Sequence, residues 1–253
     1  MSGRSALVTG GARRIGRAIA LTLAAHGWDV AVHYGGSRDD AEALAAEIKQ
    51  HERRATALAA DLTREAEVTS LVPRAIDAIG PLTLLVNNAS VFERDDAMTV
   101  TRASWDRHIE TNLRAPFVLM QKFAQQLPAD ADGSVVNILD ERVWNLTPYF
   151  VSYTVSKAAL WTLTQTMALA LAPRIRVNGI GPGPTLPSPR QSDEQFRRQV
   201  ELLPLQRGTS PDEIARAVMF ILESPAMTGQ MIALDGGQHL NWAPTSRVPL
   251  ASE

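Results

Sequence analysis

Tyr153 and Lys157 stand four residues apart in a segment whose apolar residues recur at helical spacing. Side chains four residues apart share one face of a helix, so we expect the phenol and the ammonium side by side. A neighbouring cation favours the phenolate and should lower the Tyr153 pKa from its ordinary value of about 10. This pair therefore predicts a proton donor that works near neutral pH. A surface tyrosine beside a solvated lysine is the alternative.

The segments that must position this pair alternate between predicted strands and helices. The strands are expected at residues 5–8, 29–33, 55–60, 82–86, 134–139, 174–180 and 231–234, and the helices at 15–24, 38–50, 65–79, 104–127, 153–172 and 211–223. The strands are near-continuous apolar runs, which is typical of a parallel sheet buried on both faces. We therefore predict an α/β fold with a doubly wound, seven-stranded parallel sheet, in a single domain spanning residues 1–253.

The composition argues against several classes of function. The net charge is −2, so we expect no broad basic surface and no nucleic-acid partner. The chain has no cysteine, and its five histidines are scattered without the spacing of a zinc site, so we predict no metal. The N-terminal region has no long apolar run, which predicts neither a signal peptide nor a membrane span. We expect a cytoplasmic protein.

A glycine-containing turn follows the first predicted strand and leads into the first helix. It contains Gly10, Arg13, Arg14, Ile15 and Gly16. Glycines let the backbone approach a pyrophosphate, and the N-terminus of a helix stabilises the negative charge of that group. Such a turn is weak evidence alone, but its position between a strand and a helix near the N-terminus favours dinucleotide binding.

The second predicted strand ends without the acidic residue that usually binds the ribose hydroxyls of NAD. Tyr34, Ser37 and Arg38 follow instead, and Arg13 and Arg14 are expected nearby. Guanidinium groups suit the 2′-phosphate that distinguishes NADP from NAD. We therefore predict NADP(H) as the cofactor. The alternative is that these arginines are solvated surface charges.

The chain resembles the short-chain dehydrogenase/reductase family from about residue 4 to residue 240. The resemblance rests on motifs in the family's order and spacing: Thr9-Gly10 with Gly16, Asp61-Leu62, Asn87-Asn88-Ala89, Asn112, Tyr153-x-x-x-Lys157 and Pro182-Gly183. It implies a Rossmann-type fold and a nicotinamide cofactor.

The resemblance also assigns roles to individual residues. It places Asp61 and Leu62 at the adenine, Asn87 and Ala89 at the ribose side, and Pro182 and Gly183 at the nicotinamide. It implies that Asn112 shapes the central helix and holds a water that relays protons to Lys157.

Two positions depart from the common family pattern. Arg14 occupies a position in the turn where the family usually has glycine. Asp140, thirteen residues before Tyr153, occupies the place of the family's catalytic serine. A carboxylate, unlike a serine hydroxyl, cannot donate a hydrogen bond to a carbonyl oxygen unless it is protonated. We therefore expect Asp140 to pair with a cationic or N–H-rich group, or to share a proton with Tyr153.

With both departures, the chain resembles the pteridine reductases and the related dihydromonapterin and dihydrofolate reductases of the short-chain type. The matching residues here are Arg14, Ser90, Phe92, Asp140, Tyr153 and Lys157. The resemblance implies a catalytic set of Asp140, Tyr153, Lys157 and Asn112. It implies that the substrate contacts Arg14, Ser90, Phe92 and Tyr153, with Phe92 stacking a flat ring against the nicotinamide.

The implied activity is NADPH-dependent hydride transfer to a C=N bond of a pterin or dihydrofolate-like ring, with Tyr153 as the proton donor. One alternative is an NADPH-dependent reductase of a ketone or a 3-oxoacyl thioester, which Asp140 argues against. A non-catalytic NADPH-binding regulator is another, which the intact Tyr153 and Lys157 argue against. Glu141, Arg142 and Trp144 receive no assignment from the sequence.

Three further expectations concern the shape of the molecule. Residues 184–200 are rich in proline and lack periodicity, and we predict a mobile lid over the substrate. Residues 241–253 are predicted to form a C-terminal tail. The resemblance implies a homotetramer assembled through the helices at 104–127 and 153–172, whose apolar residues Phe117, Leu119, Met120, Trp161 and Met167 suggest burial on two sides.

Overall fold

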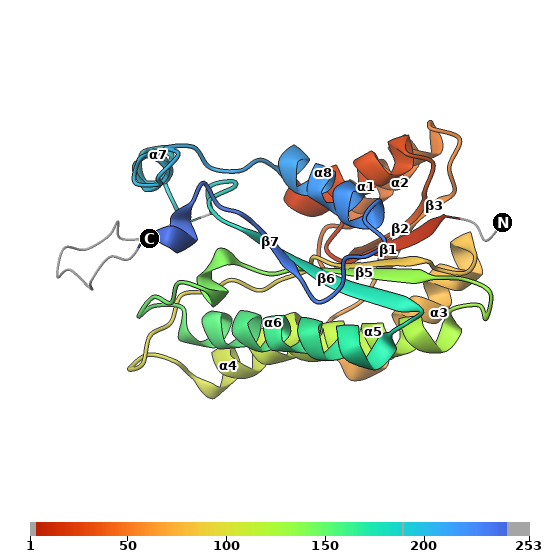
Figure 1. The fold of residues 1–253 in the computed structure, drawn as a ribbon, viewed down its shortest axis with the longest axis horizontal. Coiled ribbons are helices and arrows are strands. Elements are labelled where there is room, and N and C mark those ends of the chain that lie inside the picture. The colour runs from red at the N-terminus through yellow and green to blue at the C-terminus, as the bar shows by residue number, and fades with distance from the viewer. Residues whose placement is uncertain (1–3, 189, 242–253) are drawn as a thin grey trace.

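The seven strands form one parallel sheet with the order β3-β2-β1-β4-β5-β6-β7 (Figure 1). The computed structural model describes residues 4–188 and 190–241. The strands are β1 (Ser5–Val8), β2 (Asp29–Tyr34), β3 (Ala55–Ala59), β4 (Leu84–Asn87), β5 (Gly133–Ile138), β6 (Ile175–Pro182) and β7 (Met231–Leu234). The predicted seven-stranded Rossmann-type sheet is confirmed. The predicted tail at 241–253 lies, apart from Asn241, outside the described residues.

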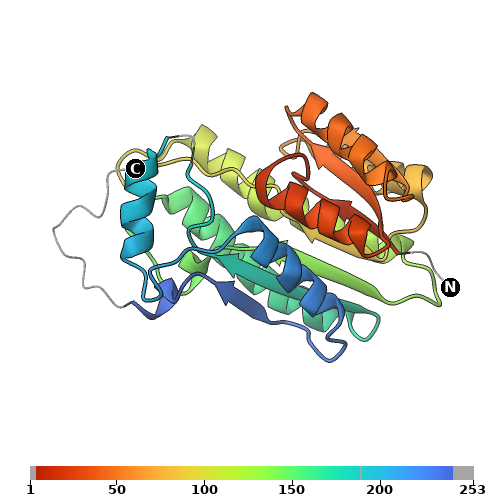
Figure 2. The ribbon, with the colours of Figure 1, turned by 90° about the horizontal axis from the view of Figure 1, so that it is seen from above.

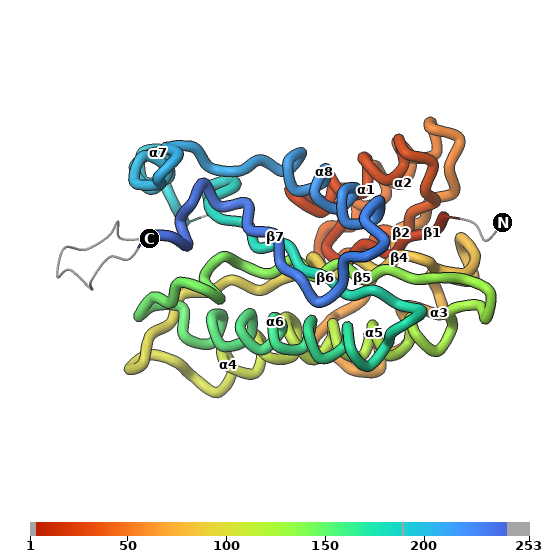
Figure 3. Tube along the Cα trace, viewed as in Figure 1, coloured from red at the N-terminus to blue at the C-terminus, as the bar shows by residue number. Residues whose placement is uncertain are grey.

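Helices cover both faces of this sheet (Figures 1 and 3). One face carries α1 (Arg14–Ala25), α2 (Arg38–Lys49) and α8 (Pro211–Leu222), and the other carries α3 (Glu65–Ile79), α5 (Ala115–Gln126) and α6 (Val151–Leu171), with α4 (Arg102–Ile109) alongside α6. No helix in the described ranges is long and apolar enough to cross a membrane.

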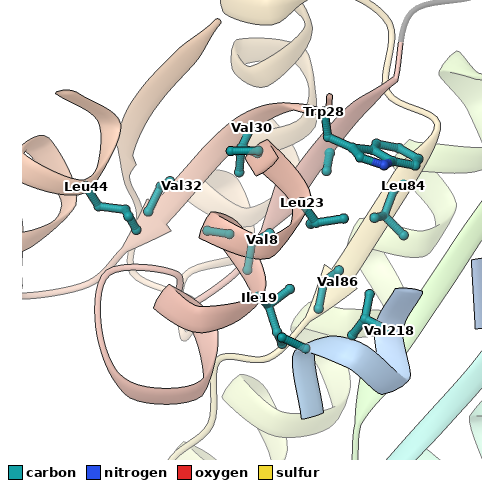
Figure 4. Close-up of a cluster of buried hydrophobic side chains, with 14 of the residues drawn as sticks. Val8, Ile19, Leu23, Trp28, Val30, Val32, Leu44, Leu84, Val86 and Val218 are labelled. Atoms are coloured by element: carbon teal, nitrogen blue, oxygen red, sulfur yellow. The ribbon is translucent and has the colours of Figure 1, made fainter. Parts of the chain in front are cut away.

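The core explains why the strands read as unbroken apolar runs. On β1, Val8 packs with Ile19 of α1 and Val218 of α8 on one face, while Leu7 belongs to the core of the opposite face (Figure 4). All four side chains are fully buried. Burying an aliphatic side chain of this size stabilises the fold by about 1.5–3 kcal/mol, so both layers of helices hold the sheet.

The order of the strands determines where a ligand can bind. The chain winds from β1 outward to β3, then returns to β4 beside β1 and continues to β7. In such sheets ligands bind beyond the carboxyl ends of the strands at the point where the direction reverses. Gly10, Asn88 and Asp140 follow β1, β4 and β5 at this edge.

The predicted helix at residues 104–127 is not continuous. After α4 the chain forms a π-helical turn over Glu110–Arg114, which contains Asn112, before α5 begins at Ala115. A π-turn adds one residue to the helical repeat, and such turns occur often at functional sites. Apolar periodicity does not reveal this interruption because the flanking helices keep their buried faces.

The expectation that residues 184–200 lack regular structure is wrong in part, because α7 (Asp193–Glu201) occupies their second half. Figure 2 shows α7 beyond the end of the sheet that carries the strands' carboxyl ends. A capping box begins the helix: Ser192 Oγ accepts from the Gln195 N–H, and the Gln195 side chain accepts from the Ser192 N–H. The helix fully buries no side chain, and its apolar residues Phe196 and Val200 form only a two-residue stripe, which is too short to predict a helix by itself. The role of 184–200 as a lid stays a prediction.

A chain of buried hydrogen bonds positions α6 against the sheet. Asn87 Nδ2 donates to Asn137 Oδ1 at 2.8 Å, and Asn137 Nδ2 donates to Thr164 Oγ1 at 2.9 Å. Thr164 Oγ1 donates in turn to the Leu160 carbonyl at 2.8 Å. Because these side chains are buried, water cannot replace a lost partner, and the chain locks β4, β5 and α6 together.

Replacing Thr164 with valine is expected to leave the Asn137 amide without an acceptor while keeping the shape of the side chain. The free energy of unfolding should fall by about 1–3 kcal/mol, measured by chemical denaturation. Thr162→Val is the matched control, since Thr162 makes the same bond to a carbonyl four residues earlier but is exposed. Equal losses in the two variants would contradict a structural role for the buried chain.

Candidate active site

Hydrogen bonds from neighbouring strands hold the turn that follows β1. Thr9 Oγ1 accepts from the backbone N–H groups of Asn88 and Ala89 at 2.9 and 3.0 Å. Asn88 Nδ2 donates back to the carbonyls of Thr9 and Gly10 at 2.9 and 3.0 Å. A Cβ at Gly16 would lie 2.2 Å from the Gly10 carbonyl oxygen, so only glycine permits this close approach of helix and turn.

His33, near the end of β2, holds the same turn through hydrogen bonds of its imidazole ring. Its Nδ1 accepts from the Gly10 N–H at 3.0 Å, so the ring proton lies on Nε2, which donates to the Ala60 carbonyl at 3.1 Å. Burial lowers the pKa of His33 from 6.5 to about 4. The imidazole is therefore neutral near pH 7 and fixes the distance between the turn and the end of β3.

A cavity of about 710 Å³ opens above this turn. Most of the residues predicted to bind the cofactor line it: Gly10, Arg13, Arg14, Ile15, Gly16, Asp61, Leu62 and Ala89. Of the other six predicted residues, Pro182 and Gly183 line a second cavity described below, and four line neither cavity. Tyr34 and Asn87 are buried in the protein, Ser37 precedes α2, and the exposed Arg38 side chain lies 3.6 Å from Glu42. The roles predicted for these four stay predictions.

Arg14 links the turn to the segment that precedes α7. Its guanidinium donates to the carbonyls of Leu186 and Pro187 at 3.2 and 3.1 Å. Its backbone φ of 52° lies in the left-handed region, which costs roughly 1–2 kcal/mol for a residue with a Cβ. The position keeps the conformation that the family's glycine adopts easily, and it gains a side chain that reaches the predicted lid.

The predicted catalytic residues lie together at the start of α6 and the end of β5. Tyr153 Oη donates to Asp140 Oδ2 at 2.7 Å. Lys157 Nζ donates to the Ile138 carbonyl at 2.7 Å and lies 5.7 Å from the centre of the Tyr153 ring. Tyr153 and Lys157 are both buried, so they form a packed pair rather than a solvated one.

The expectation that Lys157 lowers the pKa of Tyr153 is wrong for this arrangement. Burial, followed by the negative charge of Asp140, raises the Tyr153 pKa well above its ordinary value. Burial also lowers the pKa of Lys157 to about 8. The spacing of residues identified the neighbouring cation and Asp140, which the structure places in a hydrogen bond with Tyr153, but not the depth of burial. Burial and the carboxylate both favour the protonated phenol. Tyr153 therefore keeps its proton at neutral pH.

Asn112 lies within the π-turn and connects three segments. Its Oδ1 accepts from the Val91 N–H at 2.8 Å, and its Nδ2 donates to the Val91 carbonyl and to Ser156 Oγ at 2.9 and 3.0 Å. Ser90 Oγ also donates to its Oδ1 at 3.2 Å. Asn112 is buried and holds the segment after β4 against α6, while the predicted proton relay through it stays a prediction.

A second cavity of about 570 Å³ adjoins the first and is lined by three of the predicted catalytic residues. Arg14, Ser90 and Asn88 line both cavities. The second is also lined by Phe92, Asp140, Tyr153, Lys157, Pro182 and Gly183. The described ranges contain no group of histidine, aspartate or glutamate side chains that could hold a metal ion.

Phe92 belongs to an aromatic cluster at this cavity. Its ring stacks on Phe150 with centres 4.5 Å apart and an angle of 6°, and it meets the Tyr153 ring edge-on at 4.7 Å. Phe150 has a left-handed φ of 60° at the position before α6. The cluster fixes the orientation of both Phe92 and Tyr153.

The chain matches the short chain dehydrogenase family over residues 4–198. It belongs to this family. A 3-oxoacyl-[acyl-carrier-protein] reductase FabG of Staphylococcus epidermidis is 35% identical over 242 residues, which cover 94% of this chain and 99% of the relative.

Two solved structures of family members are more similar in sequence. FolM alternative dihydrofolate reductase 1 from Brucella canis, complexed with NADP, is 51% identical with a TM-score of 0.91, and the match covers 97% of this chain and 98% of that one. The Brucella suis protein, also in complex with NADP, is 53% identical with a TM-score of 0.92, covering 96% and 97%. Within the family, the chain therefore falls in the subgroup that Asp140 and Arg14 indicated.

Sequence reasoning missed two residues that hold this family's cofactor turn in the present chain. His33 is the last polar residue of a buried strand, and Asn88 lies between two predicted site residues. Their positions at strand ends were the available signal. Neither role follows from residue type, because both side chains bind backbone atoms of the turn.

The pH dependence of stability should reveal the neutral His33. Its pKa is lower in the folded chain, so below pH 6.5 the unfolded chain takes up a proton that the folded chain does not. Stability is thus lost as the pH falls from about 6.5 toward 4. The contribution of His33 is expected to be about 2 kcal/mol between pH 7.5 and 5, measured by denaturant unfolding.

His33→Asn is the informative variant because asparagine keeps an acceptor for the Gly10 N–H but does not titrate. It should lose less stability than the parent protein over the same pH range. His51→Asn, at an exposed histidine, serves as the control and should behave like the parent. Identical pH profiles for all three proteins would contradict the role given to His33.

The left-handed Arg14 can be tested with a pair of variants that both remove its side-chain bonds. Arg14→Gly relieves the backbone conformation, whereas Arg14→Ala retains the cost of the Cβ. We expect the glycine variant to be more stable than the alanine variant by roughly 1 kcal/mol in denaturant unfolding. An alanine variant as stable as the glycine variant would show that the turn adapts to the Cβ.

Proposed function

We propose that this protein is an NADPH-dependent reductase that transfers hydride to a C=N bond of a pterin or dihydrofolate-like ring. The observation that carries the proposal is the 2.7 Å hydrogen bond from Tyr153 to Asp140 inside the second cavity. The FolM proteins, which share about half of the residues of this chain, are named alternative dihydrofolate reductases, and this supports a substrate of that class.

The cofactor is NADP(H). The first cavity combines a glycine turn, a helix N-terminus and the cations Arg13 and Arg14, which suits a phosphate-rich dinucleotide. Arg13 forms an exposed pair with Asp40, with 2.6 Å between Nε and Oδ2, and an exposed pair of this kind is weak enough to be exchanged for a phosphate. Bound NADPH would supply the hydride.

Asp140 favours a nitrogen-containing substrate over a simple carbonyl compound. An ionised carboxylate only accepts hydrogen bonds, so it repels a carbonyl oxygen but can bind the N–H of a partly reduced ring. Tyr153 enters the reaction protonated, because burial and Asp140 raise its pKa. We infer that Tyr153 donates its proton to the ring nitrogen and that Lys157, 5.7 Å from the ring centre, stabilises the charge left on the phenol.

The aromatic cluster suits a flat substrate. The Phe92 ring is packed on Phe150 at the wall of the second cavity, which holds the ring rigid, and in the proposal it stacks on the substrate. Stacking of two rings contributes about 0.5–1.5 kcal/mol beyond burial. Ser90 and Arg14 also line this cavity, and in the proposal they bind polar atoms of the heterocycle.

A carbonyl reductase is the second candidate, and the similarity to the FabG relative favours it. That chemistry would use a hydroxyl group to bind the substrate oxygen, whereas this chain has Asp140 at the expected position. A regulator that binds NADPH without turnover would not need the buried Tyr153 and Lys157. We therefore rank both below the pterin reductase.

A homotetramer in the cytoplasm completes the proposal. Leu119, Met120 and Met167 are buried within the protomer, so they are not accessible for a contact between subunits. Phe117 and Trp161 are only partly buried, and they stay candidates for the contact.

The decisive assay is NADPH oxidation with dihydrobiopterin, dihydromonapterin, dihydrofolate, an oxidised pterin and an acetoacetyl thioester. We expect turnover of at least one pterin or folate. Tyr153→Phe should lower kcat by roughly 10²–10⁴-fold because the proton donor is removed, and Asp140→Ala should lose pterin turnover. Tyr149→Phe, at a half-exposed tyrosine outside the cavity wall, is the matched control.

Turnover of the thioester alone would overturn this assignment in favour of the carbonyl reductase. Asp140→Ser tests the choice between the two enzymes independently. A serine at this position should raise thioester activity only if the chain is a carbonyl reductase. Tight binding of NADPH without turnover of the whole panel would favour the regulator.

A further inference from the structure

Two pairs of an acidic and a basic residue, Glu93 with Arg107 and Glu141 with Arg142, line the second cavity. Of these described residues, only the first pair forms an ion pair. Arg107 Nη1 lies 2.8 Å from Glu93 Oε1, so these two side chains satisfy each other. Glu141 and Arg142 line the same cavity. Within the part of the chain that the structure describes, Glu141 Oε2 and Arg142 Nε and Nη1 are buried atoms without a hydrogen-bond partner.

Leaving such groups unpaired is costly. The Glu141 residue is only 4% exposed, and a buried polar atom without a partner costs about 1–3 kcal/mol. Gln238, which lines the same cavity, adds another buried oxygen without a partner. Proteins satisfy the great majority of such atoms, so three unsatisfied side chains around one cavity indicate that something else binds them.

Both side chains of the pair are held in place without using these atoms. The backbone N–H of Arg142 donates to Asp140 Oδ1 at 2.9 Å, which ties the short helical turn Glu141–Val143 to the catalytic carboxylate. The Arg142 guanidinium lies over the Phe150 ring at 5.0 Å. The polar atoms are therefore fixed beside the catalytic groups and remain available to a ligand.

We propose that Glu141 and Arg142 bind the amino-pyrimidinone edge of the substrate ring and so make the enzyme specific for 2-amino-4-oxo heterocycles. This inference rests on the proposed reduction of a pterin-like ring. An amino-pyrimidinone presents neighbouring N–H groups beside a carbonyl oxygen. A carboxyl group can pair with the N–C–N edge through both oxygens, and a guanidinium can donate to the carbonyl.

The raised pKa of Glu141 fits this pairing. Burial, followed by the charge of Asp140, raises the pKa of Glu141 to about 8. The two N–H groups of the edge favour the ionised carboxyl, so a bound amino-pyrimidinone stabilises the charge that burial disfavours, whereas the carbonyl oxygen at the same place in a 2,4-dioxo ring does not. Ketones and thioesters have no such edge, so the pair also gives a physical reason for excluding them.

The test compares two substrates that differ only in this edge, a 2-amino-4-oxo dihydropteridine and its 2,4-dioxo analogue. Glu141→Met removes the polar atoms with little change in volume. It should lower kcat/KM for the amino substrate by ~10- to 100-fold and leave the dioxo analogue nearly unchanged. Arg142→Met, which keeps the apolar stem on Phe150, should raise KM for both substrates because both have the 4-oxo group.

Glu93→Met and Arg107→Met are the matched controls, because they alter the satisfied pair in the wall of the same cavity. Both should keep the preference for the amino substrate. The melting temperature of Glu141→Met should stay unchanged or rise, since no protein partner is lost. A large fall in melting temperature, or equal losses on both substrates, would overturn the inference and indicate a structural role.

A binding measurement separates this inference from the proposed function. If the parent protein reduces none of the pteridines, the proposed function fails. Calorimetric titration of an oxidised pterin into the protein saturated with NADP⁺ then decides the inference alone. Binding that weakens at least tenfold in Glu141→Met but not in Glu93→Met supports it, whereas unchanged binding or no binding overturns it.

Discussion

The hydrogen bond between Tyr153 and Asp140 constrains everything around the site. It holds Tyr153 Oη 2.7 Å from Asp140 Oδ2, which requires the first turn of α6 to keep its position relative to the end of β5. The buried amide chain through Asn137 and Thr164 holds these two elements together from within the core. Burial, followed by the negative charge of Asp140, raises the pKa of Tyr153 and keeps a proton on the phenol. The packing that brings Tyr153 to Asp140 therefore also sets the acidity of Tyr153.

Much of the fold follows from the sequence because its physical basis is local. The strands are apolar runs buried on both faces, and each helix with an inward stripe was expected within a few residues of its observed bounds. The exceptions give only a weak apolar signal. Helix α7 has two apolar residues and fully buries neither, and the π-turn at Glu110–Arg114 shifts the backbone without changing which faces are apolar.

The site was less accessible to sequence reasoning, since its chemistry depends on burial and on neighbours distant in the chain. The spacing of Tyr153 and Lys157 predicted their proximity correctly. It could not reveal that burial and Asp140 together reverse the direction of the Tyr153 pKa shift. Residue type suggested Arg38 for a phosphate; this side chain is exposed beside Glu42 and lines neither cavity, and its role stays a prediction. Charge identifies candidates, but only packing decides which of them face a cavity.

Arg14 and Asp140, the two departures from the family pattern, both line the second cavity. Arg14 retains a backbone conformation that suits glycine, and Asp140 places a carboxylate beside a phenol that would otherwise be more acidic. The left-handed backbone of Arg14 costs free energy in the unliganded protein. In the proposed function, a substrate rich in N–H and carbonyl groups contacts Asp140, Glu141 and Arg142 together. A simple ketone offers an acceptor for Arg142 but no N–H group for either carboxyl group. The proposed function therefore favours a heterocycle as the ligand of this cavity.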